Sequence, residues 1–433
     1  MKPTSRPEHR ALDAAARQVG TGGALDRMLR KRVIETLSAL RGGALVIDDP
    51  VDRVLLGEAV VGQAPVWLRV HDLAFYRVLA MQGSVGAGEA YGDGLWQTDD
   101  LVGLVRLLVR NRALLDGMET GMARVAGLLL KAWHARRANT KQGSRRNIAA
   151  HYDLGNPFFA LFLSSDLMYS SALWDGPQDT LEAASRRKLD TICRKLDLKP
   201  GEHVVEIGTG WGGFALHAAR EYGCKVTTAT ISREQYTLAR ERVAEAGLGD
   251  RVDVQLCDYR DLQGQYDKLV SIEMIEAIGA DYQETYFAKI ESLLKPRGSA
   301  LIQAITIEDH RYAQAVRSVD FIKRHIFPGS FIPSVQGMLA AKTRATELAL
   351  VHLEDFGLSY ARTLAAWRAR FLVNVAEVQA QGFDARFIRL WEFYLAYCEG
   401  GFAERAIGVS HLLLTRPGAR PSQARWTACE GAV

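Results

Sequence analysis

The chain has 433 residues, of which 48% are hydrophobic and 24% are charged, and its net charge is +4. This composition is typical of a soluble globular protein, and the length accommodates two or three domains. No run of about 18 uncharged apolar residues occurs, which argues against a membrane-spanning helix, and the first residues lead into no apolar signal segment. The five cysteines lack the spacing of a metal site, so we expect reduced thiols in a cytoplasmic protein.

The sequence over residues 25–115 predicts a small separate domain. Leu45–Ile47 and Pro65–Val70 have strand character, and the glycine-rich segment Gly83–Gly94 has the character of strands and turns. Over Leu104–Trp133, basic residues alternate with apolar clusters, as they do in a pair of amphipathic helices.

A basic stretch without acidic residues follows this region. Its cationic residues are Arg136, Arg137, Lys141, Arg145 and Arg146. The stretch fits an interdomain linker, and equally a segment that docks on an anionic membrane surface, where each Lys or Arg contributes about 1 kcal/mol. No aromatic residues interleave with these charges, so nucleic acid is not expected as a partner.

The most informative segment covers residues 203–213 and reads His-Val-Val-Glu-Ile-Gly-Thr-Gly-Trp-Gly-Gly. A β-branched run breaks into a glycine-rich turn, and the glycines allow a ligand to approach the backbone closely at the carboxyl end of a strand. The segment lacks the Gly-Lys-Ser/Thr of a phosphate loop and the glycine order of a dinucleotide fingerprint. An acidic residue just before the first glycine, here Glu206, is the pattern of methyltransferases that use S-adenosylmethionine (SAM).

Strand-like and helix-like segments alternate around this turn, which predicts βαβ units in a doubly wound α/β sheet. The expected strands are Val204–Ile207, Lys225–Ile231, Val252–Cys257, Lys268–Ile272 and Ser299–Ile307. The expected helices are Phe214–Tyr222, Arg233–Ala246 and Tyr282–Leu294. Cofactor contacts should come from successive strand ends, so the further candidates are Thr230, Gln235, Asp258 and Tyr259.

Motifs along most of the chain resemble the cyclopropane fatty acid synthase family. In chain order they are Gly83–Trp96, His151–Phe159, Met168–Trp174, Val205–Gly213, Thr230–Gln235, Asp320–Gly329, Ile332–Ser334, Tyr360–Trp367 and Tyr397–Phe402. The resemblance implies a class I SAM-methyltransferase sheet with helical substrate-side insertions, plus a small N-terminal α+β domain. The expected organisation is an N-terminal membrane- or lipid-associated domain over 1–133, a basic linker over 134–148 and a catalytic domain over 149–433.

The resemblance also implies an activity, which is transfer of the SAM methyl group to the cis double bond of an acyl chain in a membrane phospholipid. Loss of a proton from the new methyl group then closes a cyclopropane ring, and in the family a bound bicarbonate ion takes that proton. Its contacts fall on Ser171, Glu276, Gln303, the main chain of Ile305, and Tyr360. The cofactor contacts fall on Tyr169, Ser170, Gly208, Gly210, Trp211 and Gly212, besides the strand-end residues named above. A homodimer that associates peripherally with an anionic membrane is implied as well.

The chain departs from the common bacterial pattern of this family at the bicarbonate site. Ser171 stands where a cysteine is usual, Gln303 where a histidine is usual, and Ala277 where a histidine follows the glutamate. These departures keep open C-methylation that gives a methyl-branched or methylene product, and a non-catalytic lipid-binding relative. If bicarbonate is not used, Glu273 and Glu276 are the nearest candidate bases, and a methyl-branched or methylene product is then favoured.

The basic stretch yields a test of membrane docking. If it recruits anionic vesicles, activity should fall as salt rises, because surface charges are screened beyond about 8 Å at physiological ionic strength. Replacing Arg136, Arg137, Arg145 and Arg146 by glutamine should flatten this dependence in an assay on anionic phospholipid vesicles. A salt profile that the replacements leave unchanged would favour the linker interpretation.

Overall fold

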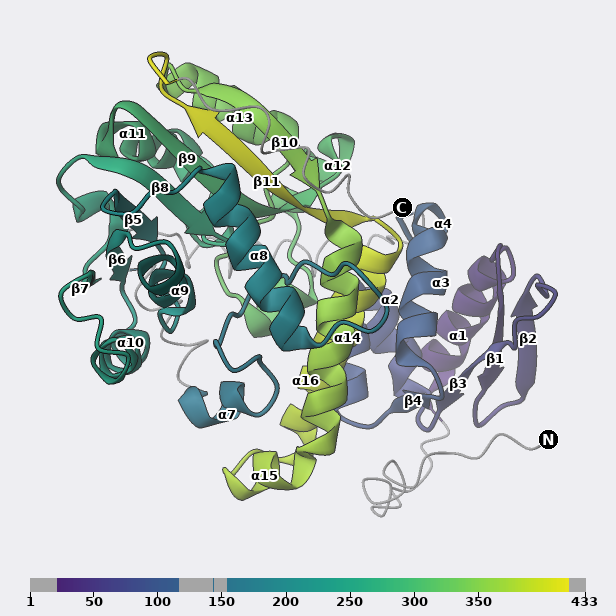
Figure 1. Ribbon diagram of the computed structural model, residues 1–433. Helices are drawn as coiled ribbons and strands as arrows, with labels where there is room; N and C mark the ends of the chain where they lie inside the picture. The colour runs from purple at the N-terminus through teal and green to yellow at the C-terminus, as the bar shows by residue number, and fades with distance from the viewer. Residues whose placement is uncertain (1–21, 117–142, 144–153, 420–433) are drawn as a thin grey trace. The chain divides into compact units, whose positions relative to one another are not determined.

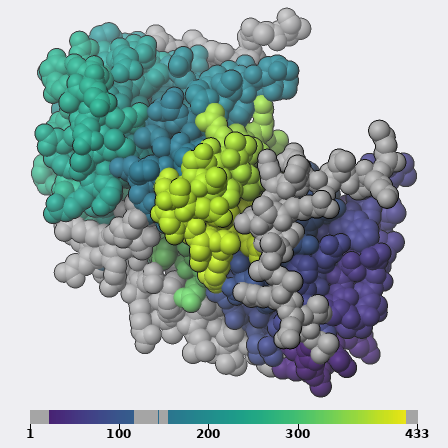
Figure 2. Space-filling model, turned by 90° about the horizontal axis from the view of Figure 1, so that it is seen from below, coloured from purple at the N-terminus to yellow at the C-terminus, as the bar shows by residue number. Residues whose placement is uncertain are grey.

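The computed structural model describes residues 22–116, 143 and 154–419. The chain divides into two compact units. The first comprises Met1–Trp133, Ser318–Ile326 and Arg368–Glu404, and the second comprises His134–Arg317, Phe327–Trp367 and Arg405–Val433. Figure 1 labels the elements of both units, and in the space-filling view the purple and blue residues of the N-terminal segment gather into one body (Figure 2).

The second unit is built on a seven-stranded sheet with the order β10-β11-β9-β8-β5-β6-β7. Its strands are β5 (His203–Ile207), β6 (Lys225–Thr230), β7 (Val252–Leu256), β8 (Tyr266–Ile272), β9 (Leu294–Ile307), β10 (Ala349–Asp355) and β11 (Ile407–Thr415). Strands β5 to β9 pair in parallel, whereas β10 and β11 pair antiparallel. The five strands predicted from the sequence are confirmed, and β10 and β11 are additions that the sequence analysis did not foresee.

Helices surround this sheet. They are α7 (Asn156–Ala160), α8 (Leu181–Lys195), α9 (Gly213–Glu221), α10 (Arg233–Glu245), α11 (Gln283–Leu293), α12 (Asp309–Arg317) and α13 (Val335–Ala345), with short 3₁₀ turns η2 (Tyr259–Asp261), η3 (Ile275–Ala277) and η4 (Ala280–Tyr282). Helix α14 (Gly357–Val373) runs from the second unit into the first. The three helices predicted between the strands are confirmed as α9, α10 and α11.

The strands alternate between two apolar layers, as a sheet covered on both faces requires. Val205 and Leu269 pack with α11 and α13 in one cluster, whereas Val204 and Val270 pack with α8, α9 and α10 in the other. Chain order reverses between β5 and β8, since β6 and β7 extend the sheet on one side and β8 continues it on the other. Ligands of open α/β sheets bind outside the carboxyl ends of the strands at this kind of position.

The first unit contains a four-stranded sheet with the order β2-β1-β3-β4. Its strands are β1 (Ala44–Asp48), β2 (Arg53–Gly57), β3 (Val66–Val70) and β4 (Trp96–Thr98). Its helices are α1 (Ala24–Leu37), α2 (Ala74–Gly92), α3 (Leu101–Arg110), α4 (Arg112–Asp116), α15 (Val375–Ala380) and α16 (Ala385–Ala403), together with the π-helical turn η5 (Ile322–Ile326). Among the described residues, no helix combines the length and apolar character needed to cross a membrane.

The prediction of strands and turns over Gly83–Gly94 was wrong, because most of this segment lies in α2. Inside α2, Gly83 alone departs from helical geometry, with φ of 54°, and kinks the helix. Gly88 is required by packing instead, since a Cβ there would lie 2.3 Å from the Phe321 ring. The amphipathic pair expected over 104–133 is represented by α3 and α4 only, and its remainder and the basic stretch 136–146 lie outside the described residues, apart from residue 143.

Candidate active site

The glycine-rich turn after β5 forms the bed of the candidate cofactor site. Gly208, Gly210 and Gly212 all have positive φ, at 96°, 52° and 85°. A Cβ at Gly208 would lie 2.8 Å from Cγ of Met274, whereas a Cβ at Gly210 would meet no atom within 4 Å. The turn therefore needs glycine for its backbone, and at Gly210 it leaves open space for a ligand.

Glu206, the acid before the turn, is buried at the end of β5. Its carboxylate accepts a hydrogen bond of 2.6 Å from the Thr228 hydroxyl, which lies 2.8 Å from the Thr209 hydroxyl. Burial raises the pKa of Glu206 to about 8, against the opposing effect of the Thr228 bond and the Lys188 charge. Glu206 of β5 is therefore linked by a hydrogen bond to Thr228 of the neighbouring strand β6, close to the glycine-rich turn.

The expected cofactor lid, Met168–Trp174, contacts the first turn of α8, where Leu173 N donates to the carbonyl of Ala184 at 3.1 Å. The Tyr169 ring packs between Phe159 and Trp367, with ring centroids 5.3 Å away in each case. The Ser170 hydroxyl accepts a hydrogen bond of 2.8 Å from Nζ of Lys188, a fully buried residue of α8. Burial lowers the pKa of Lys188 to about 8, although the nearby carboxylates of Asp166, Glu273 and Glu206 oppose this change.

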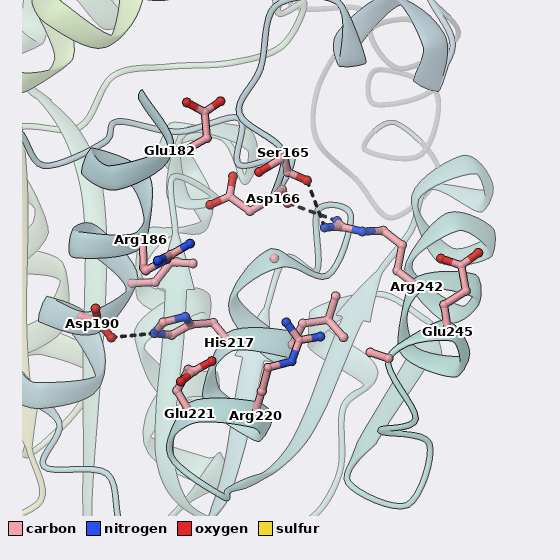
Figure 3. Close-up of a pocket in the computed structure, with 14 residues that line it drawn as sticks. Ser165, Asp166, Glu182, Arg186, Asp190, His217, Arg220, Glu221, Arg242 and Glu245 are labelled. Carbon is pink, nitrogen blue, oxygen red and sulfur yellow. Dashed lines mark hydrogen bonds and ion pairs between the residues drawn. The ribbon is translucent and has the colours of Figure 1, made fainter. Parts of the chain in front are cut away.

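Trp211 joins the glycine turn to α7, because its indole N–H donates to the Asn156 side chain at 2.7 Å. Arg242 of α10 donates to the carbonyls of Trp211 and Asp166, at 2.6 and 3.1 Å. Figure 3 shows Arg242 reaching toward Ser165 and Asp166 across a charged groove of about 650 Å³ lined by α8, α9 and α10. Of the predicted site residues, all of which are described, none lines this groove, so we interpret it as the outer support of the lid.

The remaining predicted cofactor residues lie at the ends of β6 and β7. The Thr230 hydroxyl donates to the Gln235 side chain at 2.9 Å, so these two residues act as one unit. Asp258 accepts two bonds of 2.7 Å from the Arg260 guanidinium, and the neighbouring Tyr259 is buried. The structure thus brings the strand-end candidates to the same edge of the sheet as the glycine turn.

Three of the five predicted catalytic residues, Ser171, Gln303 and Tyr360, converge on Glu273 at the carboxyl end of β8. The Glu273 carboxylate accepts hydrogen bonds from Ser171 N at 2.9 Å, the Gln303 amide Nε2 at 2.8 Å and the Tyr360 hydroxyl at 2.7 Å. The Ser171 hydroxyl points elsewhere and donates to the carbonyl of Ala172. Three groups expected to hold an anion therefore surround a carboxylate of the chain itself.

The backbone of Glu273 is strained, with φ of 49° in the left-handed region. This conformation costs about 1–3 kcal/mol for a residue with a side chain and is commonest at functional sites. It is held in place by the main chain, since Glu273 N donates to Gln303 O at 2.7 Å. The turn directs the side chain toward Ser171 and Tyr360.

Glu276 lies one turn further on, in η3, and its surroundings differ. Its Oε1 accepts a bond of 2.5 Å from Ile305 N, whereas its Oε2 is buried without a hydrogen-bond partner among the described residues. Burial, and then the Glu273 charge, raise the pKa of Glu276 to about 8. Burial also raises the pKa of Glu273, against the bonds from Ser171, Tyr360 and Gln303. The three bonds to Glu273, against one to Glu276, therefore favour the negative charge on Glu273 and the proton on Glu276.

These contacts show whether the residues fit SAM and bicarbonate, the two ligands expected at the site. The open glycine cradle and the aromatic lid fit SAM. The donors expected for bicarbonate do not fit a further anion, because Ser171, Gln303 and Tyr360 serve Glu273 and Ile305 N serves Glu276. Lys188, which bonds Ser170, and the pair Lys195 and His411, which leads to Gln303, were not predicted from the sequence.

Comparison with known proteins gives concordant results. The family model described as "Mycolic acid cyclopropane synthetase" matches residues 139–412. The chain is 39% identical to the tuberculostearic acid methyltransferase UfaA1 of Mycobacterium tuberculosis over 80% of this chain and 82% of that protein. It is 36% identical to the cyclopropane-fatty-acyl-phospholipid synthase of Escherichia coli over 83% of this chain and 90% of that protein.

A solved structure extends this likeness to the fold. The mycolic acid cyclopropane synthase CmaA1, complexed with SAH and CTAB, superposes with a TM-score of 0.59 at 26% identity. The match covers 63% of this chain and 98% of that one. The class I methyltransferase fold expected from the sequence is thereby confirmed.

The close contact of Gly213 with the lid yields a prediction. A Cβ at Gly213 would lie 2.6 Å from Sδ of Met168 and 2.9 Å from the Asp166 carbonyl oxygen. Gly213→Ala should displace the lid, and since overpacking costs about 1–3 kcal/mol, the Kd for SAM should rise roughly tenfold. Gly249→Ala is the control, because its Cβ would meet nothing within 4 Å. Calorimetry that gives equal Kd values for both variants would show that the lid does not contribute to binding.

Proposed function

Because the chain belongs to the mycolic acid cyclopropane synthetase family of SAM-dependent methyltransferases, we propose that it methylates the cis double bond of an unsaturated acyl chain in a membrane phospholipid and closes a cyclopropane ring. In this proposal Glu273 is the base that removes the proton. The observation that carries the proposal is the Glu273 carboxylate, held by Ser171, Gln303 and Tyr360 at 2.7–2.9 Å.

The acyl chain is the proposed substrate on two grounds. The E. coli relative is named as a synthase of cyclopropane fatty acyl phospholipids, and the M. tuberculosis relative as a methyltransferase of tuberculostearic acid. An alkene is a weak nucleophile, and the cation that it forms must be kept from water. The aromatic side chains of Phe159, Phe162, Tyr169 and Trp367, which contact one another around the lid, suit such a reaction.

The residues of the chain have separable roles in this reaction. SAM supplies the electrophilic methyl group. The glycine turn and the lid hold it at the end of β5, next to the end of β8 where Glu273 lies. The π electrons of the alkene would form the bond to the methyl carbon while the C–S bond to that carbon breaks and its electron pair goes to sulfur, which leaves a cation on the neighbouring alkene carbon. Glu273 then takes a proton from the new methyl group, and the electrons of that C–H bond form the third bond of the ring.

The position of the base supports ring closure. From the sequence, a base supplied by the chain was expected to give a methyl-branched or methylene product. However, the Glu273 carboxylate accepts hydrogen bonds from Ser171, Gln303 and Tyr360, which were expected to hold bicarbonate. In this proposal Glu273 therefore removes the proton at the place expected for bicarbonate. The charge of Lys188 favours the ionised form of Glu273 there.

A methylene-branched product is the second candidate, favoured by the 39% identity to the tuberculostearic acid methyltransferase. In this route a hydride shifts to the cationic carbon before Glu273 takes the proton. The electrons of the C–H bond then form a new double bond. A saturated methyl branch would additionally need a reductant from another protein.

Product analysis tests the proposal. The protein, SAM and vesicles of a cis-monounsaturated phospholipid should give an acyl chain heavier by one CH2 group that has lost its alkene signal, as measured by mass spectrometry and proton NMR. The rate should stay the same in buffer freed of CO2 and after bicarbonate is added back, because Glu273 is part of the chain. A product that keeps an alkene signal would establish the methylene route, and a rate that depends on bicarbonate would remove Glu273 as the base.

Replacing the two glutamates should separate their roles. Glu273→Gln should lower kcat by about 10²–10⁴-fold, the usual contribution of a general base, while the Kd for SAM changes little. Glu276→Gln keeps an acceptor for Ile305 N and should lose much less.

The wild-type pH profile supplies a second check on Glu273. Activity should fall as pH drops through the raised pKa of Glu273, above the pKa of about 4.3 of a free glutamate, because the base must be ionised. A Glu273→Gln variant with normal kcat, or an acid limb at the position of an ordinary glutamate, would contradict the assignment.

A further inference from the structure

A row of polar side chains crosses the antiparallel edge of the sheet and ends at Glu273. In the strand register, Glu354 of β10 faces His411 of β11, and His411 faces Gln303 of β9. Gln303 in turn pairs with Ile272 of β8, the residue before Glu273. Backbone pairing alone therefore aligns one polar side chain from each of β10, β11 and β9, and the row ends beside Glu273, the residue after β8.

Hydrogen bonds connect this row to α8. Nζ of Lys195, the last residue of α8, lies 3.0 Å from Nδ1 of His411 and also bonds the Glu354 carboxylate. Nε2 of His411 lies 3.0 Å from Oε1 of Gln303. Nε2 of Gln303 lies 2.8 Å from Oε1 of Glu273. Lys195, His411 and Gln303 are all buried, whereas Glu354 at the outer end is partly exposed.

The donors and acceptors of these groups allow the hydrogen bonds of the row to run in one direction, with donation from Lys195 toward Glu273. An ammonium group has donors only, so Nδ1 of His411 must accept. Burial, and then the Lys195 charge, lower the pKa of His411, which keeps the ring neutral with a single N–H. That proton must lie on Nε2, which then donates to Oε1 of Gln303. The amide of Gln303 is thereby oriented with its N–H₂ toward Glu273.

We propose that Lys195 and His411 are positioning residues that fix the tautomer of His411 and the orientation of the Gln303 amide, and so keep a donor directed at Glu273. The proposal rests on the proposed function in that Glu273 is taken as the base. With the opposite orientation, Oε1 of Gln303 would face the Glu273 carboxylate and repel it. The row is not a proton path, because the amide of Gln303 does not readily pass a proton along.

The charges around both ends of the row bear on its pH behaviour. His411 is faced by Lys195, Lys188 and His352, and the Phe356 ring packs on it edge-on at 4.6 Å. Glu273 is faced by Tyr360 of α14, Lys188 of α8 and the carboxyl group of Glu276. Removing the Lys195 side chain changes the surroundings of His411 directly, and it affects Glu273 only through His411 and Gln303.

The tautomer itself can be measured without any assay of activity. In protein labelled with ¹⁵N-histidine, the His411 signals, assigned by their loss in His411→Asn, should show a neutral ring protonated at Nε2. In Lys195→Met this pattern should change, because Nδ1 loses its donor. A ring protonated at Nδ1 in the wild-type protein would overturn the proposal, whatever the reaction turns out to be.

The effect on the base is tested by kinetics. Lys195→Met should lower kcat roughly tenfold, the effect of losing a hydrogen bond to a charged group. It should also move the acid limb of the pH profile to higher pH, because Glu273 is less stabilised as an anion, and leave the Kd for SAM nearly unchanged. Lys195→Arg should recover part of the loss. Lys199→Met, at an exposed lysine bonded to Asp197, is the matched control and should behave as wild type.

A double-mutant cycle separates positioning from general damage to the fold. If Lys195 acts through the amide, Lys195→Met should add little in a Gln303→Met background. Full additivity, or a lower kcat without a moved acid limb, would overturn the proposal. If Glu273→Gln retains activity while the tautomer and the cycle behave as expected, the positioning role stands and the assignment of the base fails.

Discussion

A partly buried carboxylate with no directly bonded cation among the described residues is the constraint around which the site is arranged. Glu273 is held by neutral donors, namely a backbone N–H, an amide and a phenol. The ammonium group of Lys188, whose charge lowers the pKa of Glu273, bonds Ser170 instead. Taking an ion out of water is expensive unless hydrogen bonds replace its hydration. Each donor to Glu273 must therefore be held in place by neighbouring residues. These residues lie in the lid, in α8 and in the antiparallel strands.

Helix α8 meets this requirement from one face. Lys188 and Lys195 lie seven residues apart, two helical turns, so they are presented on the same side of the helix. Lys188 bonds the lid next to the backbone N–H that serves Glu273, and Lys195 begins the row that ends in the Gln303 amide. Two buried lysines on an otherwise amphipathic helix are costly for folding alone, which is consistent with a role in the site.

The sequence was sufficient for the parallel part of the sheet, and it selected three of the residues whose side chains or backbone the structure brings to Glu273. The strands from β5 to β9 carry β-branched runs with helices of regular period between them, and local patterns of this kind are visible in one chain. The antiparallel strands β10 and β11 were missed because their pairing depends on contacts with β9 that are distant in sequence. The glycines of α2 were misassigned for the same reason, since Gly88 is needed by a ring of Phe321 far along the chain.

The position of Glu273 could not be predicted from its neighbours in the chain either. Glu273 and Glu276 stand three residues apart in a short apolar segment. The sequence alone cannot tell which of the two carboxyl groups holds a proton. The difference between them follows from the left-handed backbone of Glu273, which turns its carboxylate toward three hydrogen-bond donors, whereas the carboxyl group of Glu276 accepts one hydrogen bond, from Ile305 N. Because the Gln303 donor is set by strand register, a substitution in β10 or β11 that shifts the pairing would reach the reaction without touching any residue at the carboxyl ends of the strands. The antiparallel edge of the sheet is in this sense part of the active site.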